Sequence, residues 1–157
     1  MKPSVYVETS VISYLTARPS RDIIIAGQQA LTRSWWEGAA QQFMLCYSDV
    51  VWEEAARGDT AAAGERLACL TGLTEIPVTQ ITIDLAGLLL KAGALPSHAF
   101  ADALHVAVCT ANGIDILVSW NCKHIANITM QPIIERVCRE AGFEPARICT
   151  PVEMWGT

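Results

Sequence analysis

The sequence lacks the long apolar stretch of a membrane-spanning helix, because none of its apolar runs approaches about 20 uninterrupted residues. Its first residues lead directly into a short Val/Tyr run, without the long apolar segment of a secretory signal. Charged residues make up only 17% of the chain and hydrophobic residues 52%, a balance that excludes intrinsic disorder. We therefore expect a cytoplasmic protein that forms one compact domain over residues 1–157 and does not bind membranes.

The six cysteines lack the spacing of a zinc site, since no C-x-x-C pair occurs and no cysteine has a histidine at zinc-finger distance. Cys109 lies in an apolar run, where a thiol behaves as a small hydrophobic side chain. We expect free thiols, mostly buried, in a reducing compartment. Cys122 and His124 are not expected to share a proton, because side chains two residues apart on a helix diverge.

Basic residues are scarce, with 11 Lys and Arg against 16 Asp and Glu and a net charge of −5. This argues against a protein that binds nucleic acid through a basic surface. It leaves open an enzyme that acts on nucleic acid, because a carboxylate cluster that binds magnesium lowers the net charge while the metal supplies a positive field. Motifs of other enzyme classes are missing: phosphate-binding loops, G-x-S-x-G, the D-x-D-x-[TV] of aspartate-nucleophile phosphatases and H-E-x-x-H.

What is present is an alternation of short apolar segments with longer amphipathic ones. Strands are expected at residues 4–7, 43–47, 75–78, 115–119 and 147–149. Helices are expected at residues 11–17, 22–42, 49–57, 60–70, 81–92, 99–111, 123–127 and 130–141. Thr9 or Ser10 is expected to cap the first helix, and Ser48 the third. This alternation predicts an α/β sandwich with a mostly parallel sheet.

Polar side chains follow the predicted strands at the edge where ligands bind to open parallel sheets. Glu8 ends the first strand, and Glu54 lies on the helix after the second. Asp102 lies in the first turn of the helix 99–111, and Asn121 follows the fourth strand. Asp102 is the most informative of them, because it stands in a nearly apolar helix, and a buried carboxylate needs a partner, a capping role or a metal.

Taken one at a time, these carboxylates also have structural interpretations. Asp102 can cap its own helix, Glu8 can be an exposed turn residue, and Glu54 can be a solvated helix residue. His105 stands three residues after Asp102 and could orient it, although a half-buried histidine with satisfied hydrogen bonds is the favoured interpretation.

Four segments resemble the motifs of PIN domains, the ribonuclease fold of VapC-type toxins. They are Val5–Ile12 with Glu8-Thr9-Ser10 at the strand end, Ser48–Glu54 with a glutamate six residues after the serine, Ala101–Ala107 with Asp102 in D-A-x-x-x-A, and Leu117–His124 in the fourth position. Their order and spacing match over essentially the whole chain. The resemblance implies a PIN-like three-layer sandwich, in which helices flank a mostly parallel central sheet of four to five strands.

The resemblance also implies a metal-dependent endoribonuclease that hydrolyses RNA phosphodiesters, as the toxin of a type II toxin–antitoxin pair. Glu8, Glu54 and Asp102 would then be catalytic residues that bind Mg²⁺ or Mn²⁺. Asn121 would complete the catalytic site around them, and Ser10 would hydrogen-bond a carboxylate or a water behind it. The implied partners are an RNA substrate, a cognate antitoxin and a second copy of the chain in a homodimer.

Two residues depart from the family pattern. Glu8 replaces the usual aspartate, and Asn121 replaces an acid in a W-N-C-K-H form that resembles a variant branch. A neutral amide still offers an oxygen to magnesium, but the lost charge favours a single-metal site. Two alternatives stay open. One is a catalytically weak or inactive PIN-fold protein that binds RNA or a protein partner, and the other is an unrelated α/β domain whose carboxylates only cap helices.

Overall fold

Five parallel strands form one sheet at the centre of the molecule. In the computed structural model, which describes residues 1–156, the strands are β1 (Ser4–Val7), β2 (Met44–Tyr47), β3 (Thr74–Glu75), β4 (Ile116–Val118) and β5 (Arg147–Cys149). Their order across the sheet is β3-β2-β1-β4-β5, and every pairing is parallel. The carboxyl ends of the strands therefore meet at one edge, with β1 in the middle. This confirms the predicted α/β class and the parallel sheet.

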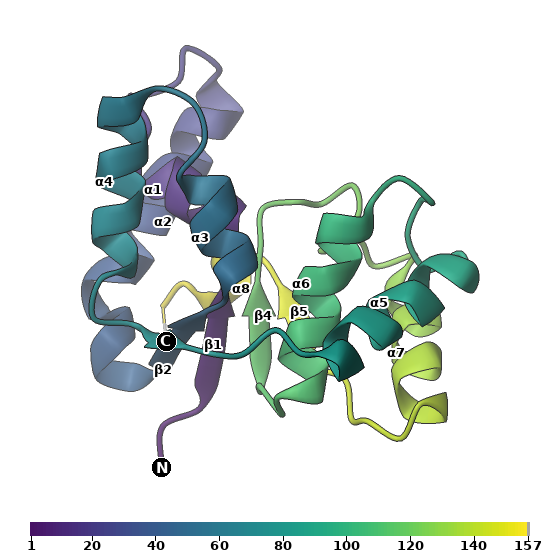
Figure 1. Cartoon of the computed structure of the whole chain (residues 1–157). Helices are drawn as coiled ribbons and strands as arrows, with labels where there is room; N and C mark the ends of the chain where they lie inside the picture. The colour runs from purple at the N-terminus through teal and green to yellow at the C-terminus, as the bar shows by residue number, and fades with distance from the viewer. Residues whose placement is uncertain (157) are drawn as a thin grey trace.

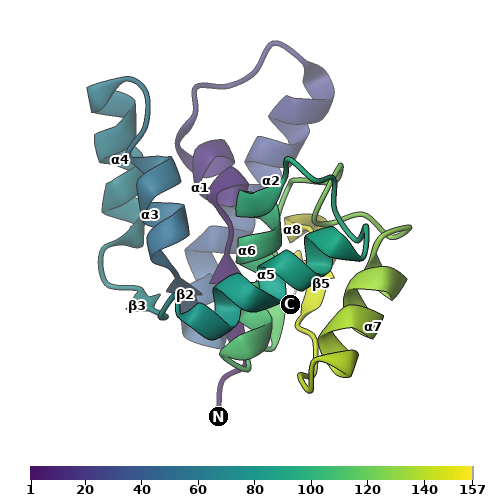
Figure 2. The ribbon, with the colours of Figure 1, turned by 45° about the vertical axis from the view of Figure 1, so that its right-hand side comes forward.

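Helices flank the sheet, as predicted. They are α1 (Thr9–Thr16), α2 (Ile23–Gln42), α3 (Asp49–Ala55), α4 (Thr60–Leu70), α5 (Gln80–Lys91), α6 (Phe100–Ala111), α7 (Gln131–Glu140) and α8 (Pro151–Met154). Figure 1 shows α1 to α4 on one side of β1 and α5 to α7 on the other, and Figure 2 shows α5 crossing in front of α6. None of the helices in residues 1–156 combines the length and the apolar character that crossing a bilayer requires.

The core is built around β1 and α6. Val5, Tyr6 and Val7 of β1 are fully buried, because neighbouring strands pair with β1 on both sides and helices cover it. In α6, every residue from 103 to 110 is buried, so this stretch has no solvent-exposed stripe of the kind found on a surface helix. The predicted site residue Asp102 and its neighbour His105 are therefore carried by a helix that is held on all sides.

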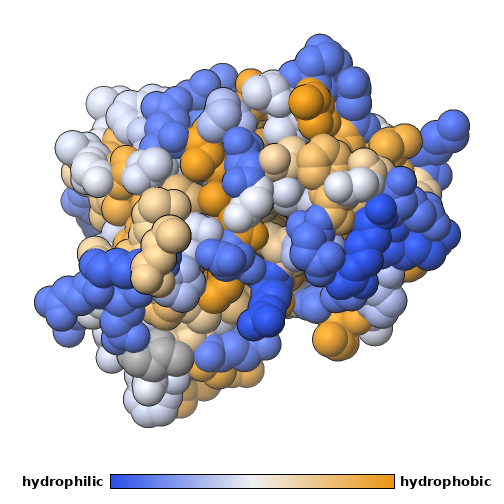
Figure 3. All heavy atoms as spheres, turned by 90° about the horizontal axis from the view of Figure 1, so that it is seen from below, coloured by the Kyte–Doolittle hydropathy of each residue, from blue (hydrophilic) through white to orange (hydrophobic). Residues whose placement is uncertain are grey.

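The surface at the end of the molecule where the strands begin mixes hydrophilic and hydrophobic residues (Figure 3). A hollow of about 920 Å³ lies at this end. The charged residues that line it are Lys2, Asp115, Glu135, Arg139, Glu144 and Arg147. This hollow contains none of the residues that the sequence singles out for chemistry.

The predicted short helix at residues 123–127 is wrong, because these residues form a series of turns. The Asn121 carbonyl accepts hydrogen bonds from the N–H groups of Ile125 (3.0 Å) and Ala126 (2.8 Å). The Asn121 side chain accepts a third bond, from the N–H of His124 (3.0 Å). These bonds close a single turn around Asn121 and leave no continuing series of i to i+4 bonds.

Two smaller differences concern a strand and the last helix. β3 spans Thr74–Glu75 rather than residues 75–78, because Pro77 has no N–H to donate to β2. Helix α8 is absent from the predicted elements, although Thr150 and Glu153 form a capping box around Pro151. A threonine followed three residues later by a glutamate is a sequence signature of a helix start, so the signal was present.

One predicted helix cap is wrong, and a second occupies the predicted position without the capping bond. Glu8, rather than Thr9 or Ser10, is the N-cap of α1, and its carboxylate accepts a hydrogen bond from the Ser10 N–H (3.1 Å). Ser48 stands at the N-cap position of α3 but makes no side-chain capping bond. Its hydroxyl hydrogen-bonds the Tyr6 hydroxyl instead (2.7 Å). The side chains of Glu8 and Ser48 thus both make their hydrogen bonds at the carboxyl ends of the strands.

All six cysteines are free, as predicted. Cys46, Cys109 and Cys138 are buried, whereas Cys122 is exposed. Burial raises the pKa of Cys46 to about 12, so this thiol stays protonated. Cys122 and His124 do not pair, because the His124 ring is hydrogen-bonded elsewhere, as described below.

Candidate metal centre

Glu8 is a buried carboxylate at the carboxyl end of the central strand, with 5% of its surface exposed. One of its oxygens, Oε2, accepts hydrogen bonds from the Ser10 N–H (3.1 Å), from the Ser10 hydroxyl and from the Ser119 hydroxyl (2.8 Å). The other oxygen, Oε1, faces His105 Nε2 at 3.9 Å. The interpretation of Glu8 as an exposed turn residue is therefore wrong.

The two serines are themselves oriented by the backbone that follows β4. Ser10 Oγ accepts a hydrogen bond from the Trp120 N–H (2.8 Å), and Ser119 Oγ accepts one from the Asn121 N–H (2.9 Å). Because each hydroxyl accepts from a backbone donor, its own hydrogen is free to point at Glu8. The carboxylate is thus held by donors from two segments that are far apart in the sequence.

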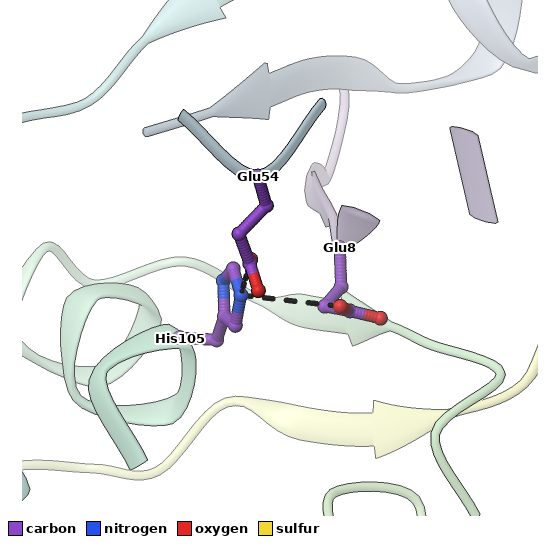
Figure 4. A group of neighbouring side chains, drawn as sticks. All are labelled: Glu8, Glu54 and His105. Carbon is purple, nitrogen blue, oxygen red and sulfur yellow. Dashed lines mark hydrogen bonds and ion pairs between the residues drawn. The ribbon is translucent and has the colours of Figure 1, made fainter. Parts of the chain in front are cut away.

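Glu54 reaches the same place from α3. Its Oε1 accepts hydrogen bonds from the Thr9 hydroxyl (2.8 Å) and from His105 Nε2 (2.5 Å). Figure 4 shows the side chains of Glu8, Glu54 and His105 pointing toward one another from three different elements. The Glu54 side chain is 24% exposed, so one side of this group faces solvent. The interpretation of Glu54 as a solvated helix residue does not hold.

His105 is the buried member of the group, with no exposed surface. Its Nδ1 hydrogen-bonds the Tyr6 hydroxyl (2.8 Å), which in turn hydrogen-bonds the Ser48 hydroxyl (2.7 Å). The ring therefore has a partner on each nitrogen and a fixed orientation. The prediction of satisfied hydrogen bonds is confirmed, but the histidine is fully buried rather than half-buried, and it bonds Glu54 instead of orienting Asp102.

The electrostatics of the pair follow from this contact. Burial works to raise the pKa of Glu54, but the hydrogen bond and the charge of His105, the Thr9 hydroxyl and the charge of Arg57 outweigh it, so the pKa is lowered. Burial likewise works to lower the pKa of His105, but the bond to Glu54 and the charges of the nearby carboxylates outweigh it, so the pKa is raised. Each partner thus favours the charged form of the other.

The remaining predicted site residues lie beside this group. Asp102 Oδ2 pairs with His124 Nδ1 at 2.7 Å, and the side chains of both are mostly buried. Asn121 Oδ1 accepts from the His124 N–H (3.0 Å). Asp102 stands one helical turn before His105, and its charge is among those that raise the pKa of His105. His124 therefore links Asp102 to Asn121 at the rim of the site.

The described residues bring together one group with metal-ligand geometry, and it consists of Glu8, Glu54 and His105. Each side chain offers one ligand atom, and these atoms lie within 4.8 Å of one another. Asp102 and Asn121 lie outside this compact group. The sequence grouped Glu8, Glu54 and Asp102 as metal ligands, with Asn121 beside them. It did not include His105, although the i, i+3 spacing from Asp102 placed both on one helix face.

The donor set fits a divalent cation. Two carboxylate oxygens and one imidazole nitrogen are all metal ligands in proteins, and the carboxylates carry the charge that such an ion requires. In residues 1–156, neither Glu8 nor Glu54 forms an ion pair with a lysine or an arginine. Among the described residues, the negative charge of the group is offset by the imidazole, by the charge of Arg57 and by hydroxyl and backbone N–H donors.

Comparison with known proteins identifies the fold. None of the protein-family models matches this chain, and no curated protein is significantly similar to it in sequence. The chain is similar in structure to VapC20 of Mycobacterium tuberculosis, a toxin that cleaves the sarcin–ricin loop. The two chains share 19% identity at a TM-score of 0.58, over 89% of this chain and 96% of the other. On this similarity, together with the parallel sheet and its flanking helices, the chain has the PIN-like fold of a VapC toxin.

Proposed function

We propose that this protein is a divalent-metal-dependent ribonuclease that hydrolyses RNA phosphodiesters. The observation that supports it most is the meeting of Glu8 and Glu54 with His105 at the carboxyl edge of a VapC-like sheet, where the three ligand atoms lie within 4.8 Å of one another. Ligands of open parallel sheets bind at this edge. The hard oxygen donors favour Mg²⁺ or Mn²⁺.

Each residue of the site has a stated role in this proposal. Glu8 and Glu54 would hold the ion together with Asp102, which pairs with His124 in the structure. The bound ion would supply the positive charge that acidifies a water and stabilises the phosphate during in-line displacement. Ser10 keeps one oxygen of Glu8 occupied, so that the other is presented to the ion. Asn121 places its amide oxygen on the N–H of His124, and so helps to fix the histidine that pairs with Asp102.

The biological setting belongs to the same proposal. VapC20 is a toxin that cleaves the sarcin–ricin loop, and we extend RNA as the substrate class to this chain. By the same extension we propose a cognate antitoxin, a homodimer and a cytoplasmic location. An antitoxin would act by covering the carboxylate group, which is open to solvent on the side of Glu54.

The test is cleavage of a mixed RNA pool with Mn²⁺, with Mg²⁺ or with EDTA. We expect cutting with either metal, none with EDTA, and a loss of about 100-fold or more in Asp102→Asn, since one charged ligand is removed. Asp84→Asn is the matched control, because this exposed aspartate on α5 bonds Gln80 and is not part of the carboxylate group. Cutting that persists in EDTA would contradict the proposal. Metal binding without cutting would favour the alternative of a PIN-fold binding protein.

A further inference from the structure

We propose that His105 is itself a ligand of the metal, through Nε2, so that the site is a mixed oxygen–nitrogen centre that prefers Mn²⁺ to Mg²⁺. This rests on the metal site of the proposed function and adds a ligand that the four-motif pattern does not include. Three features of the structure carry the inference: the spacing of the donor atoms, the hydrogen bond on the far side of the ring and the burial of the histidine.

The spacing of the donor atoms suits one ion. His105 Nε2 lies 2.5 Å from Glu54 Oε1 and 3.9 Å from Glu8 Oε1. An octahedral ion with bonds of about 2.1 Å places neighbouring ligands about 3 Å apart and opposite ligands about 4.2 Å apart. The three atoms therefore surround a position that an ion could share after Glu54 and His105 separate by about half an ångström.

The far side of the ring is arranged as in metal-bound histidines. A ligating histidine usually gives its other N–H to a fixed acceptor, which sets the tautomer and the ring angle. Here His105 Nδ1 lies 2.8 Å from the Tyr6 hydroxyl, and that hydroxyl lies 2.7 Å from the Ser48 hydroxyl. In the charged ring both nitrogens carry a hydrogen, and the one on Nε2 is donated to Glu54. If an ion takes the place of that hydrogen, the remaining hydrogen on Nδ1 stays with Tyr6 and the lone pair of Nε2 is presented to the ion. Tyr6 can then donate to Ser48, which completes the chain.

The burial of this arrangement makes the ligand position rigid. His105, Tyr6 and Ser48 all have no exposed surface, and they come from α6, β1 and the β2–α3 junction. The imidazole cannot turn away from the two carboxylates without disrupting the core.

An imidazole in the ligand set changes which ion is preferred. Mg²⁺ takes oxygen ligands and loses its waters reluctantly, whereas imidazole nitrogen is a good ligand for first-row transition ions. We therefore expect His105→Gln to weaken Mn²⁺ binding by at least about tenfold, and to weaken Mg²⁺ binding by less than about threefold. Tyr6→Phe leaves the His105 imidazole in place but removes the hydroxyl that hydrogen-bonds its Nδ1, and it should weaken Mn²⁺ binding by about tenfold.

The decisive measurement is electron spin echo spectroscopy of Mn²⁺ bound to the full chain, which detects a nitrogen directly bonded to the ion. The wild-type protein should show this coupling, and labelling histidine with ¹⁵N should change its pattern, a comparison that needs no variant to fold. His98→Gln should keep the coupling, because the His98 ring lies edge-on against that of His124, with ring centroids 5.8 Å apart, and is not part of the group formed by Glu8, Glu54 and His105. His105→Gln should lose it.

The outcomes separate this inference from the proposed function. Bound Mn²⁺ without nitrogen coupling, or coupling that survives in His105→Gln, would overturn the role of His105 and leave the ribonuclease proposal intact. Nitrogen coupling in a protein that cuts no RNA would support the ligand and overturn the nuclease. Failure of the wild-type protein to bind Mn²⁺ at millimolar concentration would overturn both.

Discussion

The two edges of the sheet stabilise their carboxylates in different ways. Where the strands begin, Asp115 accepts hydrogen bonds from the Ser4 N–H and hydroxyl, both at 2.8 Å. Its pKa is lowered, chiefly by that N–H, then by the hydroxyl and by the charge of Arg147. Where the strands end, Glu8 and Glu54 are equally well hydrogen-bonded, but their donors are hydroxyls, one backbone N–H and one histidine.

The difference lies in the supply of positive charge. The hollow at the beginning of the strands contains Lys2, Arg139 and Arg147 among its acidic residues, and Arg139 pairs with both Glu135 and Glu144. At the other edge, neither Glu8 nor Glu54 forms an ion pair with a lysine or an arginine among the described residues, and the nearby positive charge comes from His105 and Arg57. Buried carboxylates that lack a partner cation are costly, and this cost is reduced when a metal ion binds. A carboxylate cluster thus points to a metal when its oxygens are hydrogen-bonded but its negative charge is not balanced by lysine or arginine.

The largest expected effect is on RNA cleavage, which should depend on the carboxylates at the carboxyl ends of the strands and not on Asp115 at the other edge. Glu8→Gln should lower metal-dependent RNA cleavage by about 100-fold or more, because a charged ligand is lost from the centre of the group. Asp115→Asn removes the same charge at the other edge and should leave cleavage within about twofold, since long-range effects of an exposed charge are screened. Initial rates on one RNA at fixed Mn²⁺ measure both. Equal losses in the two variants would show that net charge, rather than the site, controls the activity.

Metal binding should also raise the free energy of unfolding, and this gain should depend on Glu8 and not on Asp115. At a Mn²⁺ concentration about 100 times its dissociation constant, the wild-type protein should gain about 2.7 kcal/mol, or roughly 5–10 °C in melting temperature. Thermal unfolding followed by circular dichroism measures this gain. It should persist in Asp115→Asn and disappear in Glu8→Gln. The same gain in both variants would place the ion elsewhere.

A matched pair of serines sharpens the comparison. Ser119 donates to Glu8 and accepts from the Asn121 N–H, while Ser4 donates to Asp115 and accepts from the Asp115 N–H. Ser119→Ala should cost about 2 kcal/mol in the free energy of unfolding and weaken Mn²⁺ binding, because a buried carboxylate loses a donor. Ser4→Ala should cost about 1 kcal/mol and leave Mn²⁺ binding unchanged. Urea unfolding and metal titration test both, and weaker Mn²⁺ binding in Ser4→Ala would contradict the distinction.

The smallest effect concerns acid. Because the pKa of Asp115 is lower in the folded chain than in the unfolded one, its contribution is present above the unfolded pKa of about 3.9 and is lost as the pH falls through the folded value. Asp115→Asn should therefore be less stable than wild type at pH 6, by under about 1 kcal/mol for so exposed a group, and the difference should shrink below about pH 4. Urea unfolding at several pH values follows this, and a difference that grows on acidification would reverse the assignment.

The sequence was sufficient for the elements because their signals are local. The apolar run at residues 4–7 predicts β1, and the stop at Asn112-Gly113 predicts the end of α6. The failures are also local in origin. The turn around Asn121 depends on a side chain that accepts a backbone N–H, and this competes with the short helix predicted for residues 123–127.

The sequence predicts the site residues that follow strand ends, but not the contacts of His105. Glu8 and Glu54 were paired because residues that follow neighbouring parallel strands meet at one edge. The contacts of His105 could not be predicted in this way, because its partners Tyr6 and Glu54 lie 99 and 51 residues away, and the packing of α6 decides which of them it meets. The pairing of Asp102 with His124 depends in the same way on the turn after β4.

The bond between Ser119 and Glu8 joins residues 111 positions apart. During synthesis, the first strand leaves the ribosome long before β4, and the edge of the sheet cannot close until the segment around Ser119 has emerged. Glu8, Glu54 and the Ser10 donors are all made early, yet the Ser119 hydroxyl that completes the set of donors to Glu8 follows much later. A chain that has been synthesised only as far as β2 therefore lacks one of the donors that orient Glu8, and its carboxylate group is still incomplete.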